Sequence, residues 1–221
     1  MTEANMEKKI PIVVCTVHDK CVPVLQKSVN CYAPEAELFV FKGPRTTFGE
    51  AYNSALASIF EEHDFAIIAN DDIVLTPTSL SKLMADVEAL RAQHGDALGI
   101  VGAHSDSAFP TQNIRFPNGD AEINRYLCKW PWESAARQES VVAPLFAWIS
   151  KKAFDAAHFP PINWYSDDVI CRDLVAKGFK NFVSCSYVHH VGSQTVGQDF
   201  PALRAEAEPW LRANRPALAD L

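Results

Sequence analysis

The stretch Phe65-Ala66-Ile67-Ile68-Ala69-Asn70-Asp71-Asp72-Ile73-Val74-Leu75 decides the fold of this chain. It opens with a short apolar run that is too brief for a helix and is typical of a buried strand. The polar residues that follow predict a strand ending at the carboxyl edge of an open α/β sheet, where ligands usually bind. Adjacent carboxylates at such an edge repel each other unless a cation or solvent relieves them.

Asn70 and Asp72 lie two residues apart, so on an extended chain their side chains point the same way. Their oxygen atoms can therefore bind one divalent cation. The alternative is a turn rich in aspartate that caps the next helix. This segment alone leaves the alternative open, and polar residues further along the chain favour a ligand site.

Length and composition exclude several classes of protein. A chain of 221 residues can bury one substantial core, so we expect one domain. Its 27 acidic and 20 basic residues give a net charge of −7, which disfavours a broad basic face for nucleic acid. The apolar runs are too short to span a membrane, and the first residues lack the apolar core of a signal peptide. Six cysteines without a Cys-x-x-Cys pair indicate reduced thiols, and we expect a soluble cytoplasmic protein.

The rest of the pattern predicts strands that alternate with helices. A strand at 10–17, a helix at 22–32 and a strand at 36–42 form a βαβ unit, whose crossover is normally right-handed. Four further helices are expected: Glu50 to Phe60, a helix capped by Thr78 that ends near Gly95, 151–157, and a helix capped by Ser166 that ends at Gly178. Three further strands are expected at 98–103, 141–150 and 179–188.

The segment 104–140 interrupts this pattern. It contains prolines and the aromatic residues Tyr126, Trp130 and Trp132, with little periodicity. A long irregular insert in a compact domain is usually functional or mobile, and aromatic faces suit sugars or stacked bases. We therefore expect this insert to line a ligand site.

Asp167 and Asp168 form a second acidic pair. If Ser166 caps the helix that follows, both acids lie in its first turn, where they complement the helix dipole. That role explains one acid well. Two acids behind Trp164-Tyr165, in a loop that reaches the same edge of the sheet, also suit a general base, and the pair by itself leaves both roles open.

His189 and His190 leave the last predicted strand at the same kind of edge. Consecutive residues there face opposite ways, so at most one imidazole points into a site. An imidazole beside carboxylates suits Mn²⁺ better than Mg²⁺, and the alternative is an ordinary packed or surface histidine. The Gly192-Ser193 turn allows close approach of the backbone to a ligand.

Three more residues are weaker candidates for ligand contacts. Arg45 follows the second strand and Asn53 lies on the next helix, so either side chain can reach a phosphate or a sugar. An exposed arginine and a solvated asparagine are equally ordinary. Thr16, at the end of the first strand, can contact a nucleotide base.

Taken in this order and spacing, the segments resemble the family 2 glycosyltransferases with the GT-A fold. The resemblance covers residues 10 to 197 and is carried by Ala51-Tyr52-Asn53-Ser54-Ala55, Asn70-Asp71-Asp72-Ile73-Val74-Leu75, Trp164-Tyr165-Ser166-Asp167-Asp168 and Val188-His189-His190-Val191-Gly192-Ser193. It implies a single-domain α/β fold of the GT-A (Rossmann-like) type over residues 1–198, with a mixed, mostly parallel sheet flanked by helices. Residues 199–221 then form a helical C-terminal tail.

The resemblance also implies roles for the candidate residues. Asn70-Asp71-Asp72 matches the family's Asp-x-Asp motif, with Asp72 as the metal ligand, Asn70 in place of the first Asp, and both Asn70 and Asp71 on the donor. Asp167-Asp168 matches the Glu-Asp pair that supplies the base, and Asp168 is favoured. His190 matches the family's late histidine, which helps to bind the metal or the pyrophosphate, and His189 is the alternative. Thr16, Arg45 and Asn53 match positions in the donor pocket.

The implied activity is transfer of a sugar from a nucleoside-diphosphate sugar, such as a UDP-sugar, to an acceptor hydroxyl. It implies Mn²⁺ or Mg²⁺ as the cofactor and inversion at the sugar carbon. The implied acceptor is a glycan, a lipid-linked sugar, a protein or a hydroxylated DNA base, and the insert at 104–140 is expected to form the wall of the site on the acceptor side. Two alternatives share the fold, namely a sugar-nucleotide nucleotidyltransferase and a non-catalytic binding module. The first lacks its expected glycine-rich loop, because His18-Asp19-Lys20-Cys21 follows the first strand.

Overall fold

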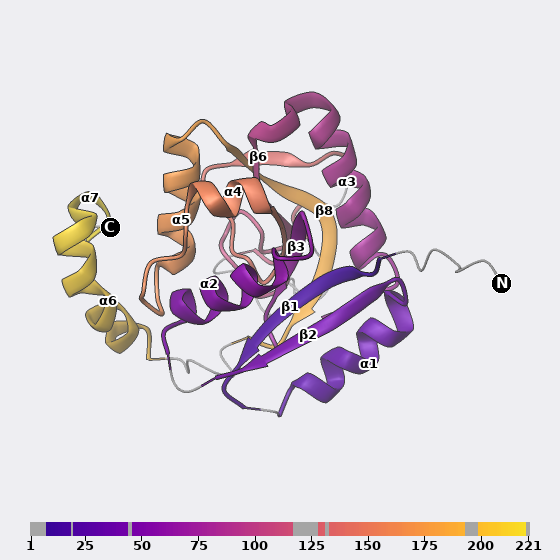
Figure 1. Ribbon diagram of the computed structural model, residues 1–221, viewed down its shortest axis with the longest axis horizontal. Coiled ribbons are helices and arrows are strands. Elements are labelled where there is room, and N and C mark those ends of the chain that lie inside the picture. The colour runs from indigo at the N-terminus through magenta and orange to yellow at the C-terminus, as the bar shows by residue number, and fades with distance from the viewer. Residues whose placement is uncertain are drawn as a thin grey trace.

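A computed structural model describes residues 8–18, 20–43, 46–116, 128–130, 133–192 and 199–219. Within these residues an eight-stranded sheet has the order β2-β1-β3-β7-β5-β8-β4, and β6 pairs with β8 (Figure 1). The strands are β1 (Ile10–Thr16), β2 (Ala36–Lys42), β3 (Phe65–Ala69), β4 (Ile73–Leu75), β5 (Leu98–Ser105), β6 (Arg137–Glu139), β7 (Phe146–Ser150) and β8 (Lys180–His190). The helices are α1 (Val22–Tyr32), α2 (Phe48–Ile59), α3 (Ser79–His94), α4 (Lys151–Ala156), α5 (Ser166–Ala176), α6 (Phe200–Asn214) and α7 (Pro216–Ala219), with a short 3₁₀ turn at Gly95–Ala97.

The sheet is mixed, as predicted. Strand β1 is parallel to both β2 and β3, and β8 is parallel to β5. Strand β7 runs antiparallel to β3 on one side and to β5 on the other, so β5 has the same direction as β3. Strands β4 and β6 are antiparallel to β8. Five strands therefore share one direction, and their carboxyl ends lie at one edge.

Two apolar layers cover the two faces of the sheet. Ile12 and Ile67 pack on one face with residues of α1 and α3, whereas Val13 and Ile68 pack on the other with α2, α4 and α5. Figure 1 shows α2, α4 and α5 on the left and α1 and α3 on the right. Burial of alternate residues on opposite faces explains why the central strands are continuous apolar runs.

The decisive stretch is two strands rather than one. Strand β3 lies between β1 and β7, but β4 pairs with the end of β8, so Ile73 lies opposite His190. The three residues between them cross the edge of the sheet. The amide of Asn70 donates to the carbonyl of Leu145 at 3.0 Å, and the carbonyl of Asp72 accepts from the amide of Val191 at 3.0 Å. This crossing brings the acidic motif to the last strand.

The ends of two helices differ from the predictions. Helix α2 begins at Phe48, two residues early, because Thr47 and Glu50 form a reciprocal capping box. Thr78 stands at the start of α3, but its side chain makes no capping hydrogen bond. Instead the hydroxyl of Ser79 accepts from the amide of Thr76 at 2.7 Å. Thr78 therefore occupies the predicted N-cap position, but its side chain does not cap the helix.

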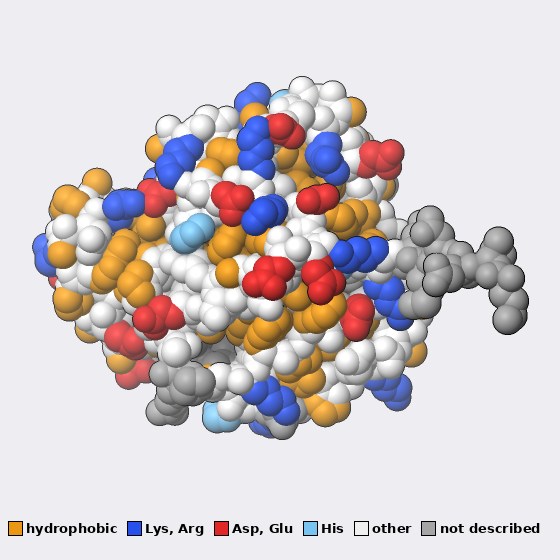
Figure 2. Space-filling view, viewed as in Figure 1, with side chains coloured by type: hydrophobic (Ala, Val, Ile, Leu, Met, Phe, Trp, Pro, Cys, Tyr) orange, Lys and Arg blue, Asp and Glu red, His pale blue; other side chains and the backbone are white. Residues whose placement is uncertain are grey.

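The described surface fits the composition. Figure 2 shows lysine and arginine side chains scattered among acidic ones on the face it displays. All six cysteines are free thiols, although only Cys171 is fully buried. No helix in the described part of the chain has both the length and the apolar character that crossing a membrane requires.

Candidate active site

Asp72 and His190 form the centre of the candidate site. The Nε2 atom of His190 lies 3.0 Å from Oδ1 of Asp72 and 3.4 Å from the amide nitrogen of Asn70. Its Nδ1 atom lies 2.6 Å from the carbonyl oxygen of Ser107. A carbonyl oxygen accepts only, so Nδ1 carries a hydrogen and donates it. Burial lowers the pKa of His190, but the hydrogen bond and charge of Asp72 outweigh burial, and with the carbonyl of Ser107 they raise this pKa.

This arrangement fits a divalent cation. A metal-binding histidine normally donates one ring N–H to a carbonyl or carboxylate, which leaves the other nitrogen for the metal. His190 does this with Ser107, and its Nε2 faces the carboxylate of Asp72. The amide of Asn70 can turn over to present its oxygen. No group of three or more His, Cys, Asp or Glu side chains suited to a cation is found in the described residues, so a cation held by Asp72 and His190 would need further ligands such as phosphate oxygens and water.

Asp71 connects the crossing segment to the first strand. The hydroxyl of Thr16, at the end of β1, lies 2.5 Å from Oδ2 of Asp71, and both side chains are buried. Burial raises the pKa of Asp71, the bond from Thr16 opposes the rise, and the charge of Asp72 adds to it. The two predicted donor contacts Thr16 and Asp71 therefore lie together at the same edge as Asp72.

Asp106 is a residue of the site that the sequence analysis missed. Its Oδ1 accepts from the backbone amide of His190 at 3.0 Å, and its Oδ2 lies 2.9 Å from Nδ1 of His189 and 3.3 Å from the guanidinium of Arg115. Burial raises its pKa, but the bond from the His190 amide and the charge of His189 prevail and lower it. An acid three residues after the predicted strand at 98–103, at the same edge as Asp72, was the available signal. The two histidines thus face different carboxylates, as their alternation predicts.

Tyr52 holds the ends of two strands together. Its buried hydroxyl donates to the carbonyl of Ala69 at 2.8 Å and accepts from the amide of Cys15 at 3.4 Å. Burial raises the pKa of Tyr52 well above its ordinary value, so the phenol stays neutral. The residue therefore fixes the point where the chain leaves β3 for the acidic motif.

Asn53 has a different role from the one predicted. Its amide nitrogen donates to the carbonyl of Phe159 at 2.8 Å, and its amide oxygen accepts from the Phe159 amide at 3.0 Å. Both atoms join two segments of the fold, so we leave Asn53 out of the proposed donor site. Arg45 and Ser193 lie outside the described residues.

Asp167 and Asp168 lie in the first turn of α5, as predicted, but Ser166 is not its cap. Tyr165 precedes the helix in a left-handed conformation, and the Ser166 hydroxyl donates instead to the carbonyl of Pro160 at 3.2 Å. Burial raises the pKa of Asp167 to about 7, and the charge of Asp168 adds to the effect. Burial also raises the pKa of Asp168, which the charge of Arg172 opposes.

The loop before α5 contacts the start of α2. The amide of Phe48 donates to Oδ1 of Asn163 at 2.9 Å, and the amide of Gly49 donates to the carbonyl of Ile162 at 3.4 Å. Helix α2 also carries Tyr52, which holds the end of β3. Figure 1 shows that α2 and α5 both begin near the edge to which β1 points. One helix therefore anchors both the acidic motif and the segment of the predicted base.

The aromatic insert is only partly described, and Tyr126 and Trp132 lie outside the described residues. The ring of Trp130 packs against charged side chains of the insert itself. The Nζ of Lys129 and the guanidinium carbon of Arg137 each lie 4.6 Å from its centroid, and the ring of His104 lies at 5.2 Å. Trp130 thus has a structural role in the insert, and the acceptor wall stays a prediction.

Comparisons with known proteins identify the fold. No family model and no curated protein matches the sequence. S. aureus TarS 1-349 in complex with UDP-GlcNAc has 15% identity and a TM-score of 0.53, over 93% of this chain and 67% of that one. GalNAc-T7 with UDP, GalNAc and Mn²⁺ has 11% identity and a TM-score of 0.56, over 85% and 44% of the two chains. A197 from STIV has 11% identity and a TM-score of 0.51, over 81% and 83%. Identities this low establish the fold alone, and the predicted GT-A-like fold of glycosyltransferases is confirmed.

Proposed function

We propose that this GT-A-like protein is a metal-dependent glycosyltransferase that transfers a sugar from a UDP-sugar to an acceptor hydroxyl, with inversion at the sugar carbon. One observation carries the proposal: Nε2 of His190 faces Asp72, while its Nδ1–H is donated to the carbonyl of Ser107. Two structures of similar fold contain related ligands, UDP-GlcNAc in TarS and UDP, GalNAc and Mn²⁺ in GalNAc-T7. The free thiols of all six cysteines support a reducing compartment, and we propose the cytoplasm.

The proposed donor site lies at the carboxyl edge of the sheet. Asp72 and His190 would hold Mn²⁺ or Mg²⁺ together with the amide oxygen of Asn70, and Thr16 and Asp71 would border the nucleotide. A bound cation neutralises the negative charge that develops on the diphosphate leaving group. Asp106 and Ser107 fix the end of β8 and the ring of His190, so the ligands keep their orientation without reorganisation.

We assign the base to the Asp167-Asp168 pair and favour Asp167. A general base works best when its pKa lies near the working pH, and the pKa of Asp167 is about 7. Its carboxylate takes the proton from the acceptor hydroxyl as the acceptor oxygen attacks the sugar carbon. The bond between this carbon and the diphosphate oxygen breaks on the opposite face, and the nucleoside diphosphate leaves with the electron pair, which gives inversion. The sequence analysis favoured Asp168. Burial raises the pKa of Asp168 too, but the positive charge of Arg172 opposes that rise.

Thermal stability with ligands tests this function first. We expect Mn²⁺ and UDP together to raise the melting temperature by more than the sum of their separate effects, because they share the Asp72–His190 site. The Asp72→Ala variant should lose this synergy. Asp96→Ala is the matched control, because Asp96 makes an exposed ion pair with Lys152 at 2.8 Å.

Hydrolysis of UDP-GlcNAc and UDP-GalNAc then tests the chemistry. We expect hydrolysis of at least one of them by the wild-type protein, its loss in EDTA, and its recovery with added Mn²⁺. Absence of both hydrolysis and ligand synergy with any nucleoside diphosphate would refute the transferase. Synergy without hydrolysis or transfer in a broad acceptor screen would instead identify a binding module.

A further inference from the structure

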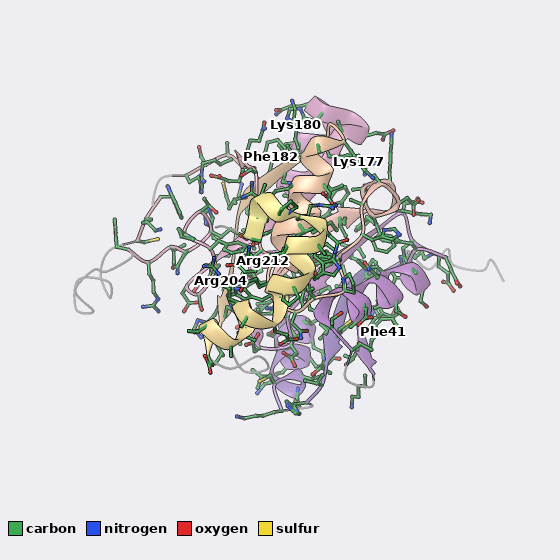
Figure 3. All side chains as sticks on the ribbon, turned by 90° about the vertical axis from the view of Figure 1, so that its left-hand side faces the viewer. Phe41, Lys177, Lys180, Phe182, Arg204 and Arg212 are labelled. Carbon is green, nitrogen blue, oxygen red and sulfur yellow. The ribbon has the colours of Figure 1, made fainter. Side chains whose placement is uncertain are left out.

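The C-terminal helices pack on the turn that starts α5. Ile162 and Val169, which flank this turn, share one apolar cluster with residues of α6 and α7, and Trp164 and Tyr165 pack against it. The members from the tail are Ala207, Leu211, Leu218 and Ala219. Figure 3 looks directly onto α6 and α7, which lie in front of α5, with Arg204 and Arg212 labelled on α6. The tail therefore covers the segment that leads to Asp167.

A polar contact links the same turn to α6 and α2 at once. The amide nitrogen of Asn163 donates to Oε1 of Glu206 at 2.7 Å, and its amide oxygen accepts from the backbone of Phe48 at 2.9 Å. Farther along, the guanidinium of Arg215 binds both oxygens of Asp173, at 3.2 Å and 2.6 Å. A two-pronged contact of this kind fixes the orientation of the tail on α5.

The turn itself holds an unfavourable conformation. Tyr165 has φ 66° and ψ 6°, in the left-handed region that a bulky side chain rarely adopts. Such a conformation is energetically unfavourable and persists only where the surroundings hold it in place. Tyr165 directly precedes Ser166 and Asp167, so its backbone sets the direction in which α5 begins. The surroundings that hold it are the apolar cluster and the contact of Asn163 with Glu206.

We propose that α6 and α7 are a positioning element of the active site, which acts by holding the left-handed turn at Tyr165 and so fixes Asp167 relative to α2. Helix α2 in turn fixes the Asn70–Asp72 segment through Tyr52, so the tail helps to set the distance between base and donor. This inference rests on the proposed transferase function. Glu206 and Asn163 are positioning residues, because they act through the turn and not on the reacting atoms.

Three variants of α6 test the inference. Glu206→Ala removes the acceptor for Asn163, whereas Glu206→Gln keeps an oxygen that can accept the same bond. Glu208→Ala is the matched control, because this acid pairs with Arg212 on the same helix at 2.6 Å and does not contact the turn. The readouts are kcat and KM for hydrolysis of UDP-GlcNAc with Mn²⁺, the pH profile of kcat, and amide hydrogen exchange over residues 163–168.

We expect Glu206→Ala to lower kcat about tenfold, because small displacements of a catalytic group are costly. Its KM for UDP-GlcNAc should stay within about twofold of the wild-type value, since the donor site is intact. The pH midpoint of kcat should shift, and exchange at 163–168 should accelerate. Glu206→Gln and Glu208→Ala should match the wild type in all these readouts.

Two results would overturn the inference: an unchanged kcat and pH midpoint in Glu206→Ala, or an equal loss of kcat in Glu208→Ala. A wild-type protein that hydrolyses neither UDP-GlcNAc nor UDP-GalNAc, and shows no synergy between Mn²⁺ and any nucleoside diphosphate, refutes the proposed function instead. Amide hydrogen exchange then still tests whether α6 holds the turn at Tyr165. Faster exchange at 163–168 in Glu206→Ala alone supports the hold on the turn, and unchanged exchange refutes it.

Discussion

The Nδ1 atom of His190 donates to the backbone carbonyl of Ser107 at 2.6 Å, and this bond selects which ring nitrogen faces Asp72. A backbone carbonyl cannot change its protonation, so the selection does not depend on pH. The backbone of His190 is held as well, by the buried carboxylate of Asp106. The end of β8 is therefore prepared for a ligand before any ligand arrives.

We predict that the two adjacent histidines have separable roles. His190→Ala should abolish the joint stabilisation by Mn²⁺ and UDP, because it removes the nitrogen that faces Asp72. His189→Ala should retain it, because His189 is half exposed and pairs with Asp106 instead. Differential scanning fluorimetry of both variants with each ligand and with the pair checks this. Equal loss in both variants would contradict the assignment of His190.

We predict that Asp167 controls the pH dependence of the reaction. The base works when ionised, so kcat should rise with pH through about 7, the pKa of Asp167. Asp167→Asn should reduce kcat by roughly 10²–10⁴-fold and remove this step from the profile. Asp168→Asn is the matched variant, and a larger loss there than in Asp167→Asn would return the assignment to Asp168.

The same carboxyl predicts a pH dependence of stability. The pKa of Asp167 is raised from 3.8 to about 7 on folding, so the folded state holds the proton more tightly than the unfolded chain. The stability from this group is complete below about pH 4 and is lost as pH rises through 7. Asp167→Asn should therefore gain stability relative to the wild type between pH 5 and pH 8. Urea denaturation at the two pH values measures the difference, and a constant difference would refute the raised pKa.

We predict that Tyr52→Phe weakens both the fold and the donor site. The substitution leaves the buried carbonyl of Ala69 and the amide of Cys15 without their shared partner, which should cost about 1–2 kcal/mol. The acidic motif directly after Ala69 should become less ordered, which raises KM for the donor. Urea denaturation and hydrolysis kinetics test the two parts separately, and an unchanged stability would contradict the role of the hydroxyl.

We predict that Gly49→Ala is strongly destabilising. An added β-carbon would lie 1.8 Å from the carbonyl oxygen of Pro160, so α2 and the loop before α5 must separate. We expect a loss of about 3 kcal/mol and a fall in melting temperature of roughly 10 °C. Gly43→Ala is the control, because nothing lies within 4 Å of its added carbon and its effect should stay within about 0.5 kcal/mol. Similar losses in both variants would refute the contact as the cause.

Local patterns predicted the elements well because their causes are local. The βαβ unit appears with the predicted helix at Val22–Tyr32 and the second strand at Ala36–Lys42, where apolar spacing and Pro34 set the limits. The start of α2 was also readable, since Thr47 and Glu50 have the spacing of a capping box.

Features that depend on distant residues could not be predicted. The stretch around Asn70 reads as one strand, because only its pairing with β8 shows that the chain crosses the sheet edge. Ser166 has the right type for a cap, but Pro160 takes its hydroxyl and tail packing fixes the turn at Tyr165. The sequence therefore indicated the acids and the histidine that the structure brings together at Asp72 and His190, whereas it did not indicate the groups that orient them, and their role stays a prediction.

The place of β8 has a consequence for biosynthesis. Strand β8 lies between β5 and β4, and its residues 188–190 pair with β4, although β4 leaves the ribosome more than a hundred residues earlier. Until then β4 lacks its partner strand, and an unpaired strand edge invites association with other chains. Premature termination between Leu75 and His190 thus yields a polypeptide that has the acidic motif but lacks the histidine that faces Asp72.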